Sequence, residues 1–292
     1  MMQKVWFITG SSRGLGKSLT EAVLKSGDLV AATARNVKQL EGFVAQYPDQ
    51  ILPIQLDVTD YDKVHLAVAE AVSHFGKIDV LVNNAGFGIT GATEAFTDEQ
   101  VRSQLETNLY APIEVTRAVL PYMRKQRSGR ILQISSIGGR MGTAGVSIYQ
   151  AAKFGLTGFT ESLANEVAEL GIKVTSVEPG GFRTDWAGNS MTYAPRIEEY
   201  ATVNQRMDFF QSGTFVPVGD PDKAAKVLLD LAVHTNPPVH LVLGSEAIGF
   251  LKSADAWRAK EMEDWMDVSL STDHDDAENF LETEMGKAYL KK

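Results

Sequence analysis

Seven short apolar runs alternate with longer helical stretches along most of the chain, and this alternation limits the fold more than any other feature. The runs do not alternate strictly in polarity, as is typical of parallel strands that are buried on both faces. Alternating strands and helices predict a parallel sheet with helices on both faces and right-handed crossovers. The predicted strands are residues 5–8, 29–32, 51–56, 78–82, 130–134, 173–177 and 239–243. The predicted helices are residues 15–26, 36–46, 60–75, 97–126, 147–170 and 220–233.

Composition excludes several kinds of chemistry. The chain has no cysteine, so disulfides, thiolate catalysis and zinc–thiolate sites are ruled out. Its five histidines are scattered without ligand spacing, which predicts no metal site. A net charge of -9 argues against binding a nucleic-acid backbone. Neither a signal peptide nor an apolar run long enough to cross a membrane is visible, so we expect a cytoplasmic protein that binds neither membrane nor nucleic acid.

A glycine-rich loop lies between the first predicted strand and the first predicted helix. Residues 9–16 read Thr-Gly-Ser-Ser-Arg-Gly-Leu-Gly. Glycines allow a backbone to approach a pyrophosphate closely, and the N-terminus of the following helix offers free N–H groups to it. The loop therefore predicts a dinucleotide site. Taken alone, a plain glycine-rich turn remains the alternative.

The end of the second predicted strand indicates which dinucleotide is preferred. NAD-binding units usually place an Asp or Glu there to hold the ribose 2′-hydroxyl. This chain has Thr33, Ala34 and Arg35 instead. The guanidinium of Arg35, together with that of Arg13 in the loop, is suited to a 2′-phosphate. We therefore expect NADP(H) to be preferred over NAD(H).

A serine, a tyrosine and a lysine supply candidate groups for carbonyl chemistry. Tyr149 and Lys153 are four residues apart, which places them on one face of a predicted helix. Ser136 follows the strand predicted at 130–134, at the sheet edge where α/β proteins bind ligands. Carbonyl reduction needs a proton donor and a group that orients the oxygen. We expect the Lys153 ammonium and the helix N-terminus to lower the pKa of Tyr149 towards neutrality.

These motifs together resemble the short-chain dehydrogenase/reductase family, in its compact single-domain branch, over about residues 3–245. The resemblance implies a Rossmann-like, doubly wound sheet of seven parallel strands in the order 3-2-1-4-5-6-7. Asn83-Asn84-Ala85-Gly86 matches the family's motif after the fourth strand. The catalytic residues that it implies are Asn108, Ser136, Tyr149 and Lys153. The predicted cofactor site consists of Gly10, Ser12, Arg13, Gly14, Leu15, Gly16, Arg35, Asp57, Val58, Asn84, Ala85, Gly86, Tyr149, Lys153, Pro179, Gly180, Phe182 and Thr184.

The resemblance also assigns individual roles. Asp57 and Val58 would contact the adenine, and Asn84 the cofactor ribose. Asn108 matches the family's helix-kink asparagine, which helps to hold a proton-relay water beside the lysine. Phe182 and Thr184, in the segment that starts at Pro179, would contact the nicotinamide.

Two segments go beyond the minimal family pattern. An insertion at about residues 184–217 is rich in aromatic residues and methionine, which predicts either a lid over an apolar substrate pocket or side chains that only pack the insertion onto the body. Residues 246–292 are expected to form a helical extension, with helices at 247–268 and 275–290, and not a separate domain from residues 1–245. Both features resemble the 17β-hydroxysteroid-dehydrogenase-like group. The family resemblance implies a homo-oligomer, either a dimer or a tetramer.

The main hypothesis is an NADPH-dependent reductase of a hydrophobic ketone or aldehyde, reversible as an alcohol dehydrogenase. Two alternatives remain. Sugar-nucleotide epimerases share the Tyr-x-x-x-Lys pair, but their loop spacing and larger substrate domain differ. A non-catalytic dinucleotide sensor or scaffold is disfavoured because Asn108, Ser136, Tyr149 and Lys153 are all present.

Overall fold

The computed structural model describes residues 3–186, 190–214 and 216–290. The chain divides into two compact units, Met1–Ile248 and Gly249–Lys292. The first unit contains the sheet and every predicted site residue. The second consists of helical segments.

A seven-stranded parallel sheet runs through the first unit in the order β3-β2-β1-β4-β6-β7-β9. This confirms the predicted order 3-2-1-4-5-6-7, since β5 and β8 lie outside this sheet. The strand ends agree with the sequence prediction to within two residues. The strands are β1 (Val5–Ile8), β2 (Leu29–Ala34), β3 (Ile51–Gln55), β4 (Val80–Asn83), β6 (Gly129–Ile134), β7 (Ile172–Pro179) and β9 (His240–Leu243).

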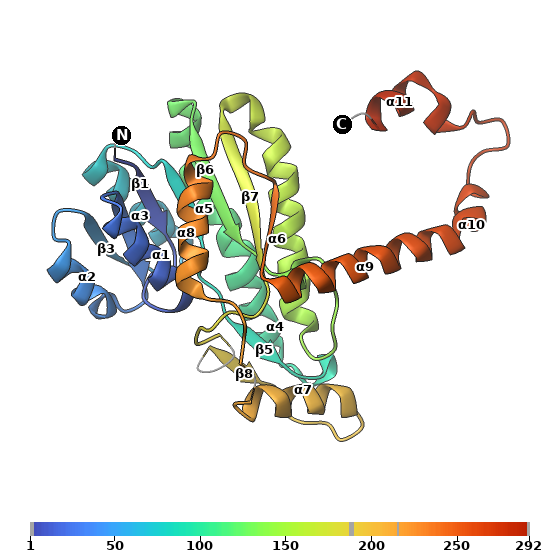
Figure 1. Ribbon diagram of the computed structural model, residues 1–292, viewed down its shortest axis with the longest axis horizontal. Coiled ribbons are helices and arrows are strands. Elements are labelled where there is room, and N and C mark those ends of the chain that lie inside the picture. Colours follow the sequence, from blue (N-terminus) through green and yellow to red (C-terminus); the bar gives the residue numbers. More distant parts are fainter. Residues whose placement is uncertain (1–2, 187–189, 215, 291–292) are drawn as a thin grey trace. The chain divides into compact units, whose positions relative to one another are not determined.

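Helices cover both faces of the sheet (Figure 1). The side chains of β1 show how the core divides between the two faces. Successive residues of a strand point to opposite faces. Trp6 and Ile8 pack in a cluster with α1 (Gly14–Lys25) and α8 (Pro221–Val233), whereas Phe7 packs in a cluster with the helices of the other face. These other helices are α3 (Tyr61–Phe75), α5 (Ala111–Gln126) and α6 (Ser147–Glu166). A short helix, α2 (Glu41–Gln46), precedes β3.

The helix predicted at residues 97–126 is divided in three. It begins with α4 (Asp98–Leu105), which Thr97 and Gln100 start with a reciprocal capping box. A π-helical turn, Glu106–Tyr110, follows and leads into α5. Such turns occur mostly as interruptions of α-helices and often mark functional sites.

The insertion contains regular elements that the sequence did not predict. Its strand β8 (Met191–Tyr193) pairs in parallel with β5 (Gly88–Thr90), forming a small second sheet. The helix α7 (Ala201–Gln211) follows. The insertion is therefore joined to the segment that follows β4 by backbone hydrogen bonds.

The C-terminal segment is helical over most of its length. It contains α9 (Ser245–Asp264), α10 (Met266–Leu270), the 3-10 turn Phe280–Glu282 and α11 (Glu284–Leu290). The predicted helix at 275–290 is wrong over residues 275–279, where the backbone forms turns and extended segments. That residues 246–292 are an extension and not a separate domain stays a prediction.

Candidate active site

Asn84, one of the predicted cofactor residues, holds the glycine loop against the end of β4. The amide of Asn84 donates to the carbonyl oxygens of Thr9 (2.9 Å) and Gly10 (3.1 Å). The hydroxyl of Thr9 accepts from the backbone N–H groups of Asn84 and Ala85. Gly10 has a φ of +69°, which favours glycine. The loop and the Asn84 segment therefore form one hydrogen-bonded unit at the sheet edge.

The first turn of α1 fits an anionic group. A Cβ on Gly16 would lie 2.2 Å from the Gly10 carbonyl oxygen, so the loop closes tightly onto the helix. Gly14 begins the helix with a φ of +53°, and the first turn carries no acidic residue. Unpaired N–H groups at the N-terminus of a helix favour phosphate. Gly10, Gly14, Leu15 and Gly16 thus provide a suitable cradle for a pyrophosphate.

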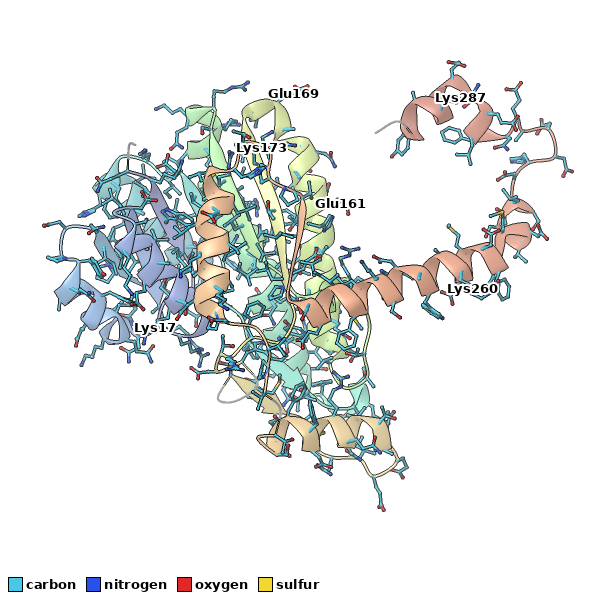
Figure 2. The ribbon with its side chains drawn as sticks, in the orientation of Figure 1. Lys17, Glu161, Glu169, Lys173, Lys260 and Lys287 are labelled. Carbon is cyan, nitrogen blue, oxygen red and sulfur yellow. The ribbon has the colours of Figure 1, made fainter. Side chains whose placement is uncertain are left out.

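The segment after β7 approaches the same loop. A Cβ on Gly14 would lie 3.4 Å from Thr184 Cβ. Both residues line a cavity of about 300 Å³ with Lys17, which Figure 2 labels on α1. Pro179 ends β7, and the backbone N–H of Gly180 donates to the carbonyl oxygen of Leu243 in β9. The structure therefore brings together the glycine loop and the segment predicted to contact the nicotinamide.

The two arginines predicted to distinguish NADP from NAD are exposed. Arg13 immediately precedes α1, and Arg35 immediately follows β2. Neither forms an ion pair with any residue that the structure describes. The carboxylate of Asp57 accepts from the N–H and hydroxyl of Thr59, while Val58 is buried. Both guanidinium groups are thus available to a phosphate.

Three predicted catalytic side chains meet at the start of α6. Tyr149 and Lys153 are both buried there, and the Ser136 hydroxyl lies close enough to the phenol of Tyr149 to favour its charged form. The Lys153 ammonium donates to the Ile134 carbonyl (2.7 Å), and its Nζ lies 5.8 Å from the centre of the tyrosine ring. The Ser136 oxygen also accepts from the Gly138 N–H (3.0 Å). These contacts place a hydroxyl, a phenol and an ammonium beside one another.

Burial determines how these groups titrate. It raises the pKa of Tyr149 to about 12, because the charged phenolate loses its hydration, and the nearby Ser136 hydroxyl offsets only part of this. Burial also lowers the pKa of Lys153 to about 8. The direction is opposite to the one predicted for Tyr149, because desolvation is the largest cause of the shift. The Lys153 ammonium donates to the Ile134 carbonyl and not to the phenol. Tyr149 is therefore a protonated phenol at neutral pH.

Asn108 lies in the π-helical turn and is buried. Its amide accepts from the Phe87 N–H (3.2 Å) and donates to the Phe87 carbonyl (2.8 Å). A Cβ on Gly86 would lie 2.6 Å from its Oδ1. The side chain of Asn108 therefore fixes the backbone that follows Asn84, Ala85 and Gly86, and the predicted role in holding a relay water stays a prediction.

Trp186, one of the aromatic residues of the insertion, lies beside the candidate site but was not among the predicted site residues. Its ring lies 5.4 Å from that of Tyr149 and 6.3 Å from that of Phe210 in α7. The insertion therefore reaches the predicted catalytic tyrosine through an aromatic contact. The available sequence signal was its position two residues after Thr184.

A buried carboxylate links the segments on either side of the site. Glu178 of β7 lies 3.4 Å from Arg140 and 2.7 Å from His240 of β9. His240 is also 3.9 Å from Glu161, which Figure 2 labels on α6. Arg140 follows the Ser136 turn and Glu178 precedes Pro179. The Arg140–Glu178 ion pair thus connects the segment that follows Ser136 to the segment predicted to contact the nicotinamide.

The fold and this constellation define a class of dinucleotide-binding enzymes, and comparison with known proteins identifies the family. The short chain dehydrogenase model matches residues 4–193. The chain is 43% identical to Oxidoreductase BOA17 of Botryotinia fuckeliana, over 93% of this chain and all of the relative. The chain belongs to the short-chain dehydrogenase family.

Solved structures agree with this assignment. A short-chain dehydrogenase from Streptomyces avermitilis is 39% identical and has a TM-score of 0.89, with 94% of this chain and all of that chain covered. ElxO with NADP bound is 27% identical, with a TM-score of 0.72, 85% of this chain and all of that chain covered. The high score over nearly the whole chain extends the likeness beyond the residues that the family model matches.

Among the described residues, no three His, Asp or Glu side chains are grouped so that they could hold a metal ion. In the same part of the chain, no helix combines the length and the apolar character needed to cross a membrane.

Proposed function

We propose that the protein is an NADPH-dependent reductase of ketones or aldehydes, reversible as an alcohol dehydrogenase. The observation that carries the proposal is the meeting of Ser136, Tyr149 and Lys153 at the sheet edge that also holds the glycine loop. In the forward reaction the carbonyl carbon gains a hydride and the oxygen gains a proton. The products are an alcohol and NADP⁺.

Each side chain has a distinct role in this reaction. When bound, the nicotinamide dinucleotide supplies the hydride. Tyr149 donates the proton to the developing alkoxide, and its raised pKa keeps it protonated for this purpose. Ser136 hydrogen-bonds the carbonyl oxygen and orients it. Lys153 places a positive charge near the phenol, and Asn108 holds the backbone at Phe87.

We propose a hydrophobic substrate of medium or large size. The insertion contacts Tyr149 through Trp186 and adds Phe210 behind it. Met191, Val203 and Met207 of the insertion are buried. Ligand pockets are typically lined by such apolar and aromatic side chains, with a few polar groups. The insertion would then act as a lid over the substrate.

We expect the purified protein to oxidise NADPH when ketones with apolar side chains are added. It should oxidise NADPH more efficiently than it oxidises NADH. The physical reason is the charge-assisted pairing of Arg13 and Arg35 with the 2′-phosphate. The measurement is absorbance at 340 nm over a carbonyl panel, after a fluorescence titration with each dinucleotide. Binding without turnover on any carbonyl would favour a sensor or scaffold.

Arg35→Gln should reduce the preference for NADPH by about ten- to a hundredfold, the effect of losing one charge-assisted contact. Its effect on NADH should be small. Arg124→Gln is the matched control, because Arg124 lies in α5, which contributes no residue to the glycine loop. An equal NADH and NADPH affinity in the wild type would contradict the cofactor proposal and leave the fold unaffected.

Reduction should slow as the pH rises, because the two buried groups titrate at different values. Tyr149, with its pKa of about 12, stays protonated across the measurable range. Lys153 loses its charge as the pH passes about 8. If the reaction needs that charge, kcat/KM for reduction should fall about tenfold between pH 7 and pH 9. A profile that stays level to pH 9.5, with the protein folded by circular dichroism, would contradict this role of Lys153.

Two further proposals concern the molecule as a whole. We propose that it acts in the cytoplasm. We also propose that it forms a homodimer or homotetramer, as the family resemblance implies. Light scattering after size-exclusion chromatography measures the assembly directly.

A further inference from the structure

One face of α7 is turned towards the catalytic centre. Val203 and Met207 are buried, and Phe210 contacts Trp186, which in turn contacts Tyr149. Residues 203, 207 and 210 are separated by four and three positions, the spacing of neighbours on one helix face. This face is apolar at these three positions.

Arg206 belongs to the same face. It precedes Phe210 by four residues and follows Val203 by three. A Cβ on Gly145 would lie 3.3 Å from Arg206 Cδ, 3.5 Å from Val203 Cγ1 and 3.6 Å from Thr90 Cγ2. Gly145 lies four residues before Tyr149, in the segment that leads into α6. The arginine stem therefore packs where α7 meets β5 and the entrance to the catalytic helix.

No described residue forms a hydrogen bond or an ion pair with Arg206. It is partly buried, and burial lowers its pKa from the ordinary value of an arginine, with no neighbouring carboxylate to offset the shift. Two other arginines of this region do have partners. Arg196 pairs with Asp208, and Arg183 donates to the Pro217 carbonyl. A partly desolvated cation on an apolar face is costly unless an anion pairs with it.

We propose that Arg206 binds a carboxylate at the far end of the substrate, so that the enzyme reduces keto acids with an apolar chain between the carbonyl and the acid. The inference rests on the proposed carbonyl reduction. The planar guanidinium can form two parallel hydrogen bonds to a carboxylate. Trp186 and Phe210 would line the apolar part of the substrate, with Tyr149 at one end and Arg206 at the other.

Matched acids and esters test this directly. The probes are 5-oxohexanoate, 7-oxooctanoate and 9-oxodecanoate, each beside its methyl ester, with saturating NADPH. For at least one chain length, kcat/KM should be higher for the acid than for the ester. Arg206→Gln should reduce that acid-to-ester ratio by about ten- to a hundredfold, mainly through KM. Arg206→Lys, which keeps the charge but loses the planar fork, should restore part of it.

Arg196→Gln is the control variant. It removes the same charge from the insertion, but Arg196 is exposed and pairs with Asp208. Asp208 lies two positions after Arg206 on α7, and so on another side of the helix. The acid-to-ester ratio should be unchanged in this variant. The melting temperature of Arg206→Gln should be no lower than that of the wild type, since the variant removes an unpaired, partly desolvated charge. Its NADPH affinity should match that of the wild type, which separates recognition from folding.

Calorimetric titration of each probe into the NADPH complex provides a readout without turnover. A wild-type enzyme that binds acid and ester equally, or an Arg206→Gln variant that keeps the wild-type ratio, would overturn the inference. A protein that reduces neither acids nor esters would instead overturn the proposed function. In that case, preferential binding of the acid that depends on Arg206 would still support a carboxylate site at Arg206, and its absence would overturn that site as well.

Discussion

Tyr149→Phe should lower kcat for ketone reduction by about a hundredfold to ten thousandfold, with little change in NADPH affinity. The variant removes only the phenol oxygen, and general acid catalysis contributes an effect of this size. The ring can still pack against Trp186, so the fold and the aromatic contact to the insertion should persist. Single-turnover kinetics at saturating NADPH, together with a fluorescence titration, measure the two quantities separately.

Tyr193→Phe provides the matched control. Tyr193 ends β8 and is partly buried, and burial raises its pKa as it does that of Tyr149. It is not among the groups that meet at Ser136, so its kcat should stay close to the wild-type value. A Tyr149→Phe enzyme that retained most of its activity would show that another group protonates the oxygen, and would refute the assignment of Tyr149.

The main sheet was predictable from the sequence because its strands are buried on both faces. Runs such as 5–8 and 130–134 are apolar without strict alternation, and each is followed by a long helical pattern. The small sheet of β5 and β8 was not predictable. Each of its strands has three residues, and they come from distant parts of the chain, so their pairing depends on tertiary structure.

The site was predictable to the extent that chemistry follows residue type and spacing. The four-residue spacing placed Tyr149 and Lys153 together, and the glycine loop fixed the position of the phosphate cradle. Titration was not predictable, because the depth of burial decides whether desolvation or a neighbouring charge prevails. The positions of Trp186 and Arg206 likewise depend on how α7 packs, which no local pattern reveals.

Gly16→Ala should destabilise the fold and weaken binding of either dinucleotide. A Cβ there would lie 2.2 Å from the Gly10 carbonyl oxygen and 2.4 Å from Asn84 Nδ2. Neither atom can move freely, since the Asn84 amide holds the loop through its bonds to Thr9 and Gly10. Overpacking of this kind costs about 1–3 kcal/mol in the free energy of unfolding. Urea denaturation and a dinucleotide titration measure both effects.

Gly42→Ala separates this steric effect from the general effect of replacing a glycine. Gly42 is exposed in α2, and a Cβ there would meet no atom within 4 Å. Since alanine is the better helix former, this variant should leave stability unchanged or raise it by no more than about 1 kcal/mol. Gly16→Ala should therefore lower the free energy of unfolding, whereas Gly42→Ala should not. If Gly16→Ala instead matched the wild type in stability and in NADPH affinity, the loop would have to open readily, and the close packing of Gly10 against α1 would not be what shapes the phosphate cradle.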